Sequence, residues 1–109
     1  MAYTSYDFSE SVQRADEFGR EDIAECLAAW GMTGDYAEWT GGFVLRLKDG
    51  RYAYLTGWCD TTGWGCQDGI EVALQDRPFN LKEIEPNAEW DHSPTDLNRY
   101  IRGEIDDFC

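Results

Sequence analysis

Hydrophobic residues near the N-terminus recur with the period of an α-helix. From Ser5 to Phe18, apolar side chains at Phe8, Val12 and Ala15 follow the spacing i, i+4 and i+7. Side chains at this spacing lie on one face of a helix. Gly19 then interrupts the pattern. The spacing therefore predicts an amphipathic helix that ends before this glycine.

The next segment, from about Arg20 to Trp30, has the same helical period. Its apolar stripe consists of Ile23, Cys26, Leu27 and Trp30. Gly31 follows the stripe, where a left-handed C-cap would end a helix. The pattern predicts a second N-terminal helix.

The period changes to two after residue 42. Phe43, Leu45 and Leu47 alternate with Val44, Arg46 and Lys48. The dipeptide Asp49-Gly50 is a strong signal for a β-hairpin with a two-residue turn. Such a turn would pair Leu47 with Tyr52, Leu45 with Tyr54 and Phe43 with Thr56. We expect these six residues to form the core face of the hairpin.

Two further elements are expected after a loop over residues 60–67. Ile70, Val72 and Leu74 alternate with polar or small residues, which predicts a third strand. A short fourth element is expected around Phe79 to Ile84.

The C-terminal segment has the signals of a helix start. Ser93 suits the N-cap, Pro94 the first helical position and Asp96 the position three beyond the cap. The expected buried stripe is Leu97, Tyr100, Ile101 and Ile105. These elements predict one α+β domain over residues 1–109, with a three- to four-stranded antiparallel sheet, two N-terminal helices and one C-terminal helix.

Acidic residues dominate the charge of the chain. Its 109 residues include 22 Asp or Glu and 9 Lys or Arg, for a formal net charge of −13. This charge argues against direct binding to nucleic acid or to an anionic membrane, since both are negative. The hydrophobic content of 42% excludes a disordered tail. The N-terminus lacks the basic start and apolar stretch of a secretion signal, so we expect a cytoplasmic protein.

Charge is unevenly distributed along the chain. The net charge is −7 over residues 1–38, +2 over 39–58 and −8 over 59–109. Glu21 and Glu25 would repel each other one turn apart on the predicted second helix. Glu104, Asp106 and Asp107 crowd the end of the last helix, where the helix dipole is negative. These acidic groups are either solvated faces or a surface that meets a cationic partner.

Four cysteines and one histidine are the candidates for metal or redox chemistry. Without a secretion signal, reduced thiols are expected, and Cys26 fits a small buried hydrophobic residue. Six residues separate Cys59 and Cys66, which is wider than a zinc knuckle allows. A zinc site would require both cysteines and His92, with Cys109 as an optional fourth ligand. We expect neither a metal nor a cofactor.

Tryptophan, cysteine and glycine are concentrated between residues 56 and 69. The glycine density indicates an ordered loop with close backbone approaches. In one interpretation Trp58 and Trp64 anchor a recognition loop that includes Asp60, because tryptophan is enriched at binding hot spots. In the other, both rings cover the sheet and fill the core.

The residues from Leu47 to Tyr54 and the W-C-D-x-T-G-W-x-C-Q segment from Trp58 to Gln67 resemble a segment of small, uncharacterised acidic bacteriophage proteins. This resemblance covers about a fifth of the chain and brings no catalytic residues. It implies a phage or prophage origin, where small acidic proteins often inactivate host defence or nucleic-acid enzymes.

Three classes of function follow. The first is a non-enzymatic inhibitor that binds a basic nucleic-acid-handling protein of the host, such as a CRISPR or restriction effector, partly by DNA charge mimicry. Its contact residues would be Glu17, Glu21, Glu25, Asp35 and Glu38, with Glu104, Asp106 and Asp107 as a second patch. The second is a phage structural or assembly protein that uses the Trp58–Trp64 loop as an interface. The third is a small metal or redox protein. No catalytic motif supports an enzyme.

Overall fold

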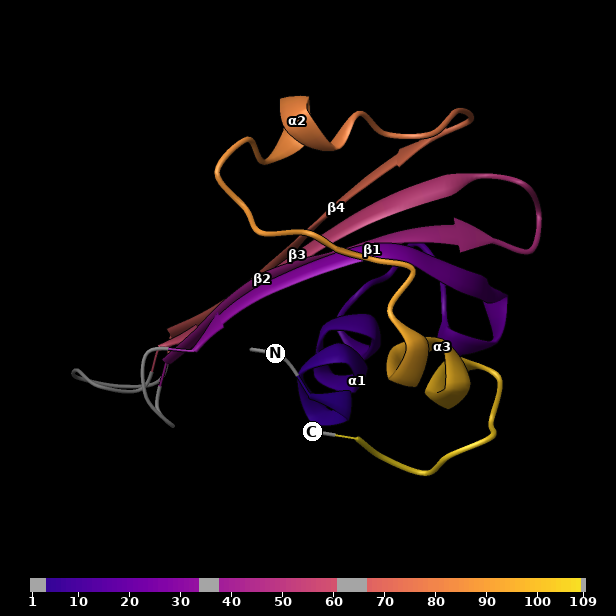
Figure 1. Ribbon diagram of the computed structural model, residues 1–109, viewed down its shortest axis with the longest axis horizontal. Coiled ribbons are helices and arrows are strands. Elements are labelled where there is room, and N and C mark those ends of the chain that lie inside the picture. The colour runs from indigo at the N-terminus through magenta and orange to yellow at the C-terminus, as the bar shows by residue number, and fades with distance from the viewer. Residues whose placement is uncertain (1–3, 34–37, 61–66, 109) are drawn as a thin grey trace.

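A five-stranded antiparallel sheet forms the centre of the computed structural model, which describes residues 4–33, 38–60 and 67–108 (Figure 1). The strands lie in the order β4-β3-β2-β1-β5. In chain order the elements are α1 (Ser5–Gln13), the 3-10 turn η1 (Arg20–Asp22), β1 (Ile23–Thr33), β2 (Glu38–Leu47), β3 (Tyr52–Asp60), β4 (Gln67–Gln75), α2 (Leu81–Ile84), β5 (Asp91–His92) and α3 (Thr95–Ile101). The α+β class is confirmed, but the sheet has five strands rather than the predicted three or four, and there is one N-terminal helix rather than two.

The predicted second helix is wrong, because Ile23–Thr33 is strand β1. This strand lies inside the sheet, paired with β2 on one side and with β5 on the other. Its register with β2 shifts twice, between Ile23 and Glu25 and between Cys26 and Ala28. Each shift interrupts the alternation of buried and exposed side chains along the strand. As a result, apolar residues recur every three or four positions, as they do in an amphipathic helix.

The predicted hairpin is confirmed, but its register is wrong by one residue. Phe43 pairs with Leu55, and Leu45 pairs with Ala53. The connection has three residues rather than two, and its last residue, Gly50, adopts φ +93°. A left-handed residue closing a three-residue loop is a common hairpin form. The extra residue moves Tyr52, Tyr54 and Thr56 to the face opposite Phe43.

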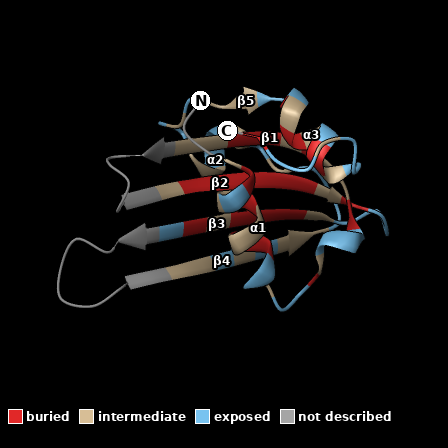
Figure 2. Ribbon diagram, turned by 90° about the horizontal axis from the view of Figure 1, so that it is seen from below, coloured by how far each residue is buried: buried red, intermediate tan, exposed pale blue. Residues whose placement is uncertain are grey.

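The main core lies between the sheet and the layer formed by α1 and α3 (Figures 1 and 2). The Phe8 ring of α1 packs edge-on against Phe43, with 5.1 Å between ring centroids. Tyr100 of α3 contacts Phe8 and Phe108 in the same way. α1 is shorter than predicted, and Phe18 reaches this core from the loop that follows it.

The ends of the described chain are held together. The Ser5 N–H donates to the Phe108 carbonyl at 3.1 Å, and the Phe108 N–H donates to Ser5 Oγ at 3.1 Å. Arg20 of η1 donates to the Tyr100 hydroxyl and carbonyl and lies over the Tyr100 ring. These contacts fix α1, η1, α3 and the C-terminal segment as one layer.

The predicted C-terminal helix is confirmed and differs in detail. α3 begins one residue later than expected, with Pro94 rather than Ser93 at the N-cap. Leu97 and Tyr100 are buried as predicted, while Ile101 and Ile105 are partly buried. The short element expected near residue 80 is helix α2, on the other face of the sheet from α1 (Figure 1). No helix among the described residues is long and apolar enough to span a bilayer.

Candidate functional site

Aromatic side chains cover the face of the sheet opposite α1, which we call the aromatic face. Because Phe43 faces α1, its neighbour Val44 and the Val44 partner Tyr54 lie on the other side. The aromatic face comprises Trp30 and Tyr54 of the strands, with Phe79 and Trp90 from the segment around α2. The Tyr54 ring centroid lies 6.2 Å from that of Phe79 and 6.1 Å from that of Trp90. The chain therefore has a second, aromatic core.

Two glycines leave room for the rings of strand aromatics directly above the backbone. A Cβ atom added at Gly42 would lie 2.6 Å from Trp30 Nε1 and 2.7 Å from Tyr54 Cε1. A Cβ atom at Gly69 would lie 2.3 Å from Trp58 Cζ2. The indole rings thus occupy the space that a side chain at each glycine would fill. A larger residue at Gly42 or Gly69 would displace the ring beside it.

The hydroxyl of Tyr54 lies at the centre of the aromatic face. It accepts a hydrogen bond of 3.0 Å from Trp30 Nε1. Burial raises the pKa of Tyr54, and the negative charge of Glu85 adds to this increase, whereas the hydrogen bonds from Trp30 and Thr56 lower it. The carboxylate of Glu85 is therefore close enough to influence this hydroxyl. Nε1 of Trp90 is buried and has no hydrogen-bond partner among the described residues.

A hollow of about 460 Å³ opens beside this aromatic core. The strands contribute Trp30, Gly31 and Thr40 to its lining. The rest of the lining comes from the α2–β5 connection, namely Glu85, Asn87, Ala88 and Glu89. The Glu85 carbonyl accepts from the Ala88 N–H at 3.3 Å, so a turn over Pro86 and Asn87 places both glutamates at the same hollow.

The acidic residues predicted to bind a partner differ in their surroundings. Glu17 and Glu21 are exposed, and neither makes an ion pair among the described residues. Glu25 lies on β1 rather than on a helix, and its Oε1 accepts a hydrogen bond of 2.9 Å from Arg46 Nε. Asp35 lies outside the described residues, and Glu38 lies on β2. The predicted repulsion of Glu21 and Glu25 along one helix is therefore wrong.

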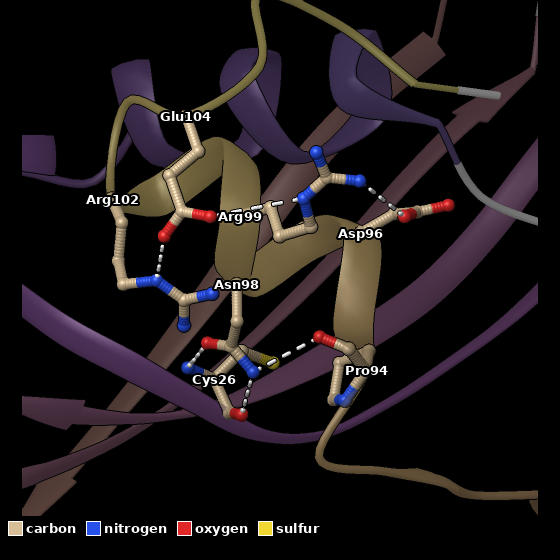
Figure 3. A network of polar contacts seen from close by, with 7 residues as sticks. All are labelled: Cys26, Pro94, Asp96, Asn98, Arg99, Arg102 and Glu104. Atoms are coloured by element: carbon tan, nitrogen blue, oxygen red, sulfur yellow. Dashed lines mark hydrogen bonds and ion pairs between the residues drawn. The ribbon is translucent and has the colours of Figure 1, made fainter.

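The second predicted acidic patch is partly neutralised (Figure 3). Glu104 accepts a hydrogen bond from Arg102 Nε and lies 3.8 Å from Arg99 Nε. The hydrogen bond from Arg102 is the main cause that lowers the pKa of Glu104. Asp106 and Asp107 are exposed beyond α3, with no ion pair among the described residues.

The residues of the Trp-Cys segment are only partly described. Trp58 lies on β3 and is 41% exposed. Asp60 ends the same strand, and Trp64 lies outside the described residues. The structure therefore places one of the two expected tryptophan anchors on the surface.

Cys26 is buried as predicted, with 1% of its surface exposed. Burial raises its pKa well above the ordinary value of a thiol, and its Sγ donates to the Ala28 carbonyl at 3.3 Å. His92 lies on β5 beside β1. Cys59 lies on β3, and Cys66 and Cys109 lie outside the described residues. Within the described residues, no three His, Cys, Asp or Glu side chains are grouped to hold a metal ion.

The sequence reasoning missed the hollow and its residues. The helical period of residues 20–30 predicts that Trp30 lies on a helix, whereas it lies on strand β1. The signal that was present is the Pro86-Asn87 pair between Glu85 and Glu89, because proline and asparagine favour the middle of a type I turn. Comparisons with protein-family models, curated proteins and solved structures found no match.

Proposed function

We propose that this chain is a non-enzymatic inhibitor that binds a basic, nucleic-acid-handling protein of a host cell, partly by DNA charge mimicry. The observation that carries the proposal is a surplus of exposed carboxylates without cationic partners. On the α1 layer they are Asp16, Glu17, Glu21, Asp106 and Asp107, none of which makes an ion pair among the described residues. A CRISPR or restriction effector is the partner class that the resemblance to phage proteins favours.

The net charge of the protein is too small for DNA charge mimicry alone to account for tight binding. The molecule is 41 Å long, and duplex DNA of that length carries about 24 phosphate charges. The net charge of the whole chain is only −13, about half of that number. One face therefore carries much less charge than the duplex it would displace. We infer that electrostatic attraction speeds and orients the encounter, while shape-specific contacts supply the remaining affinity.

Ion pairs within the protein reduce the number of carboxylates that are available to attract a partner. Glu25 is held by Arg46 and Glu104 by Arg102, so their charges are largely compensated locally. Glu17 and Glu21 make no ion pair among the described residues; Glu17 lies in the loop after α1, and Glu21 lies in η1. We propose that these two residues contribute most to the attraction.

A pair of charge reversals tests this assignment. Glu17→Lys/Glu21→Lys should reduce recovery of the partner from host lysate about tenfold, because two attractive charges become repulsive. The matched control is Asp76→Lys/Glu83→Lys, which makes the same change in net charge at Asp76, after β4, and at Glu83, on α2. We expect this control to change recovery less than about twofold. Unchanged binding by the first variant would contradict the proposal.

The second candidate is a phage assembly protein, and the exposure of Trp58 favours it. Trp58 lies over Gly69 of β4, which is an edge strand of the described sheet. Exposed tryptophan beside a sheet edge suits pairing with another chain. Light scattering separates the candidates: a homo-oligomer that persists in high salt and dissociates in Trp58→Ala would favour assembly.

A further inference from the structure

The hollow on the aromatic face has the size and the walls of a ligand site. Its volume of about 460 Å³ is within the range of small-ligand pockets, roughly 300–1,000 Å³. One wall is the central part of the sheet, where Trp30 is fixed over Gly42 by its hydrogen bond to Tyr54. The other wall is the turn between Glu85 and Glu89. The site is therefore formed before any ligand binds.

The chemistry of the lining selects a cation. Glu85 and Glu89 make no ion pair among the described residues, and the lining contains no Lys, Arg or His. The N–H of Trp30 already donates to the Tyr54 hydroxyl, so it is not available to a ligand. Trp30 can therefore contact a ligand in the hollow only through its aromatic ring. Carboxylates beside an indole attract a cation through both charge and the ring quadrupole. The pKa of Tyr54 is raised mainly by burial, and the negative charge of Glu85 adds to this increase.

We infer that this hollow binds the guanidinium group of an arginine side chain on a basic partner protein. A guanidinium group is planar and stacks on aromatic rings, and its forked donors match carboxylates. Lysine offers a compact, strongly hydrated charge without this geometry. The inference rests on the proposed function, because a basic partner supplies the arginine. The buried N–H of Trp90 takes no part, since it and the guanidinium are both donors.

A peptide titration followed by NMR tests the site directly. The probe is acetyl-Gly-Arg-Gly-amide, with the citrulline and lysine peptides for comparison. We expect saturable shifts of the Trp30 indole N–H and of the backbone amides of residues 85–89. The citrulline peptide, which has the same shape without the charge, should cause no saturable shift. The lysine peptide should bind more weakly than the arginine peptide.

Two double variants assign the binding to the hollow. Glu85→Gln/Glu89→Gln should weaken arginine-peptide binding at least about tenfold. Asp76→Asn/Glu83→Gln makes the same change in charge outside the lining and should weaken it less than about twofold. Spectra of both variants must match the wild type away from the substitutions, so that a loss of fold is recognised.

The possible results separate this inference from the proposed function. Peptide shifts that are spread over the acidic surface, and equal in both double variants, would overturn the arginine site. The charge-based proposal would then remain, provided that Glu17→Lys/Glu21→Lys still loses the partner. Stronger binding of the lysine or citrulline peptide would also overturn the arginine site.

Discussion

Replacement of Asn98 by alanine should destabilise the fold strongly, because this side chain links α3 to β1 (Figure 3). Its Oδ1 accepts from the Cys26 N–H at 2.7 Å, and its Nδ2 donates to the Cys26 carbonyl and to the Pro94 carbonyl, each at 3.0 Å. The Cys26 peptide lies beside the register shift between Cys26 and Ala28, where the ladder to β2 is irregular. Asn98 thus supplies hydrogen bonds that the sheet does not.

The expected size of the effect follows from these bonds. Each contributes about 0.5–1.5 kcal/mol net, and a buried peptide group left without a partner costs about 1–3 kcal/mol. We therefore expect Asn98→Ala to lower the free energy of unfolding by about 2–4 kcal/mol. This is a large part of the roughly 5–15 kcal/mol typical of a small domain.

Urea denaturation at neutral pH, with the thiols kept reduced, measures this change. Exposed Asn87 provides a control, because its replacement by alanine should change stability by no more than about 0.5 kcal/mol. Asn98→Asp should also be destabilising at neutral pH, since an acceptor replaces a donor opposite two carbonyls. Relative to the wild type it should recover stability in acid, where its protonated carboxyl can donate. A loss below about 1 kcal/mol in Asn98→Ala would refute this reasoning.

Three further substitutions test local features. Gly50→Ala should lower stability by about 1–2 kcal/mol in urea denaturation, because φ at this position is +93°. Gly69→Ala should displace the Trp58 ring and increase acrylamide quenching of its fluorescence, since the new Cβ would lie 2.3 Å from Cζ2. The raised pKa of Cys26 means that the folded state retains the thiol proton above the ordinary pKa of about 9.0, where the unfolded state loses it. Stability should therefore fall as pH rises above about 9, with a contribution from Cys26 of up to about 1.4 kcal/mol per pH unit, and Cys26→Ala should reduce this slope.

Helices and strands could be predicted from the sequence where the spacing of apolar residues matches the side that faces the core. β3, β4 and α3 follow the spacing of their apolar residues closely. β1 does not, because it is covered on both faces and contains two register shifts. Ala28 and Ala29 are consecutive and both buried, which no strict alternation predicts. The hairpin register depended on whether Asp49-Gly50 formed a two- or three-residue loop, and the sequence alone favours the shorter one.

Of the candidate site, only the large number of acidic residues could be predicted from the sequence. The sequence shows how many carboxylates there are, but it does not show which of them form ion pairs with arginine. Arg46 meets Glu25 only because β1 pairs with β2, a contact that a helix at residues 20–30 would have excluded. The hollow at Trp30 likewise depends on the α2–β5 connection folding back over the sheet, which requires contacts far apart in the chain.

The salt dependence of partner capture tests the central claim, that exposed carboxylates attract a cationic protein. The wild-type chain would be used to capture proteins from a bacterial host lysate in about 0.1 M and about 1 M salt, where charges are screened beyond about 10 Å and 3 Å. Mass spectrometry would identify and quantify the captured proteins. We predict that a nucleic-acid-handling protein is recovered in low salt and lost in high salt. Recovery of the same partner in equal amounts at both concentrations would contradict the account.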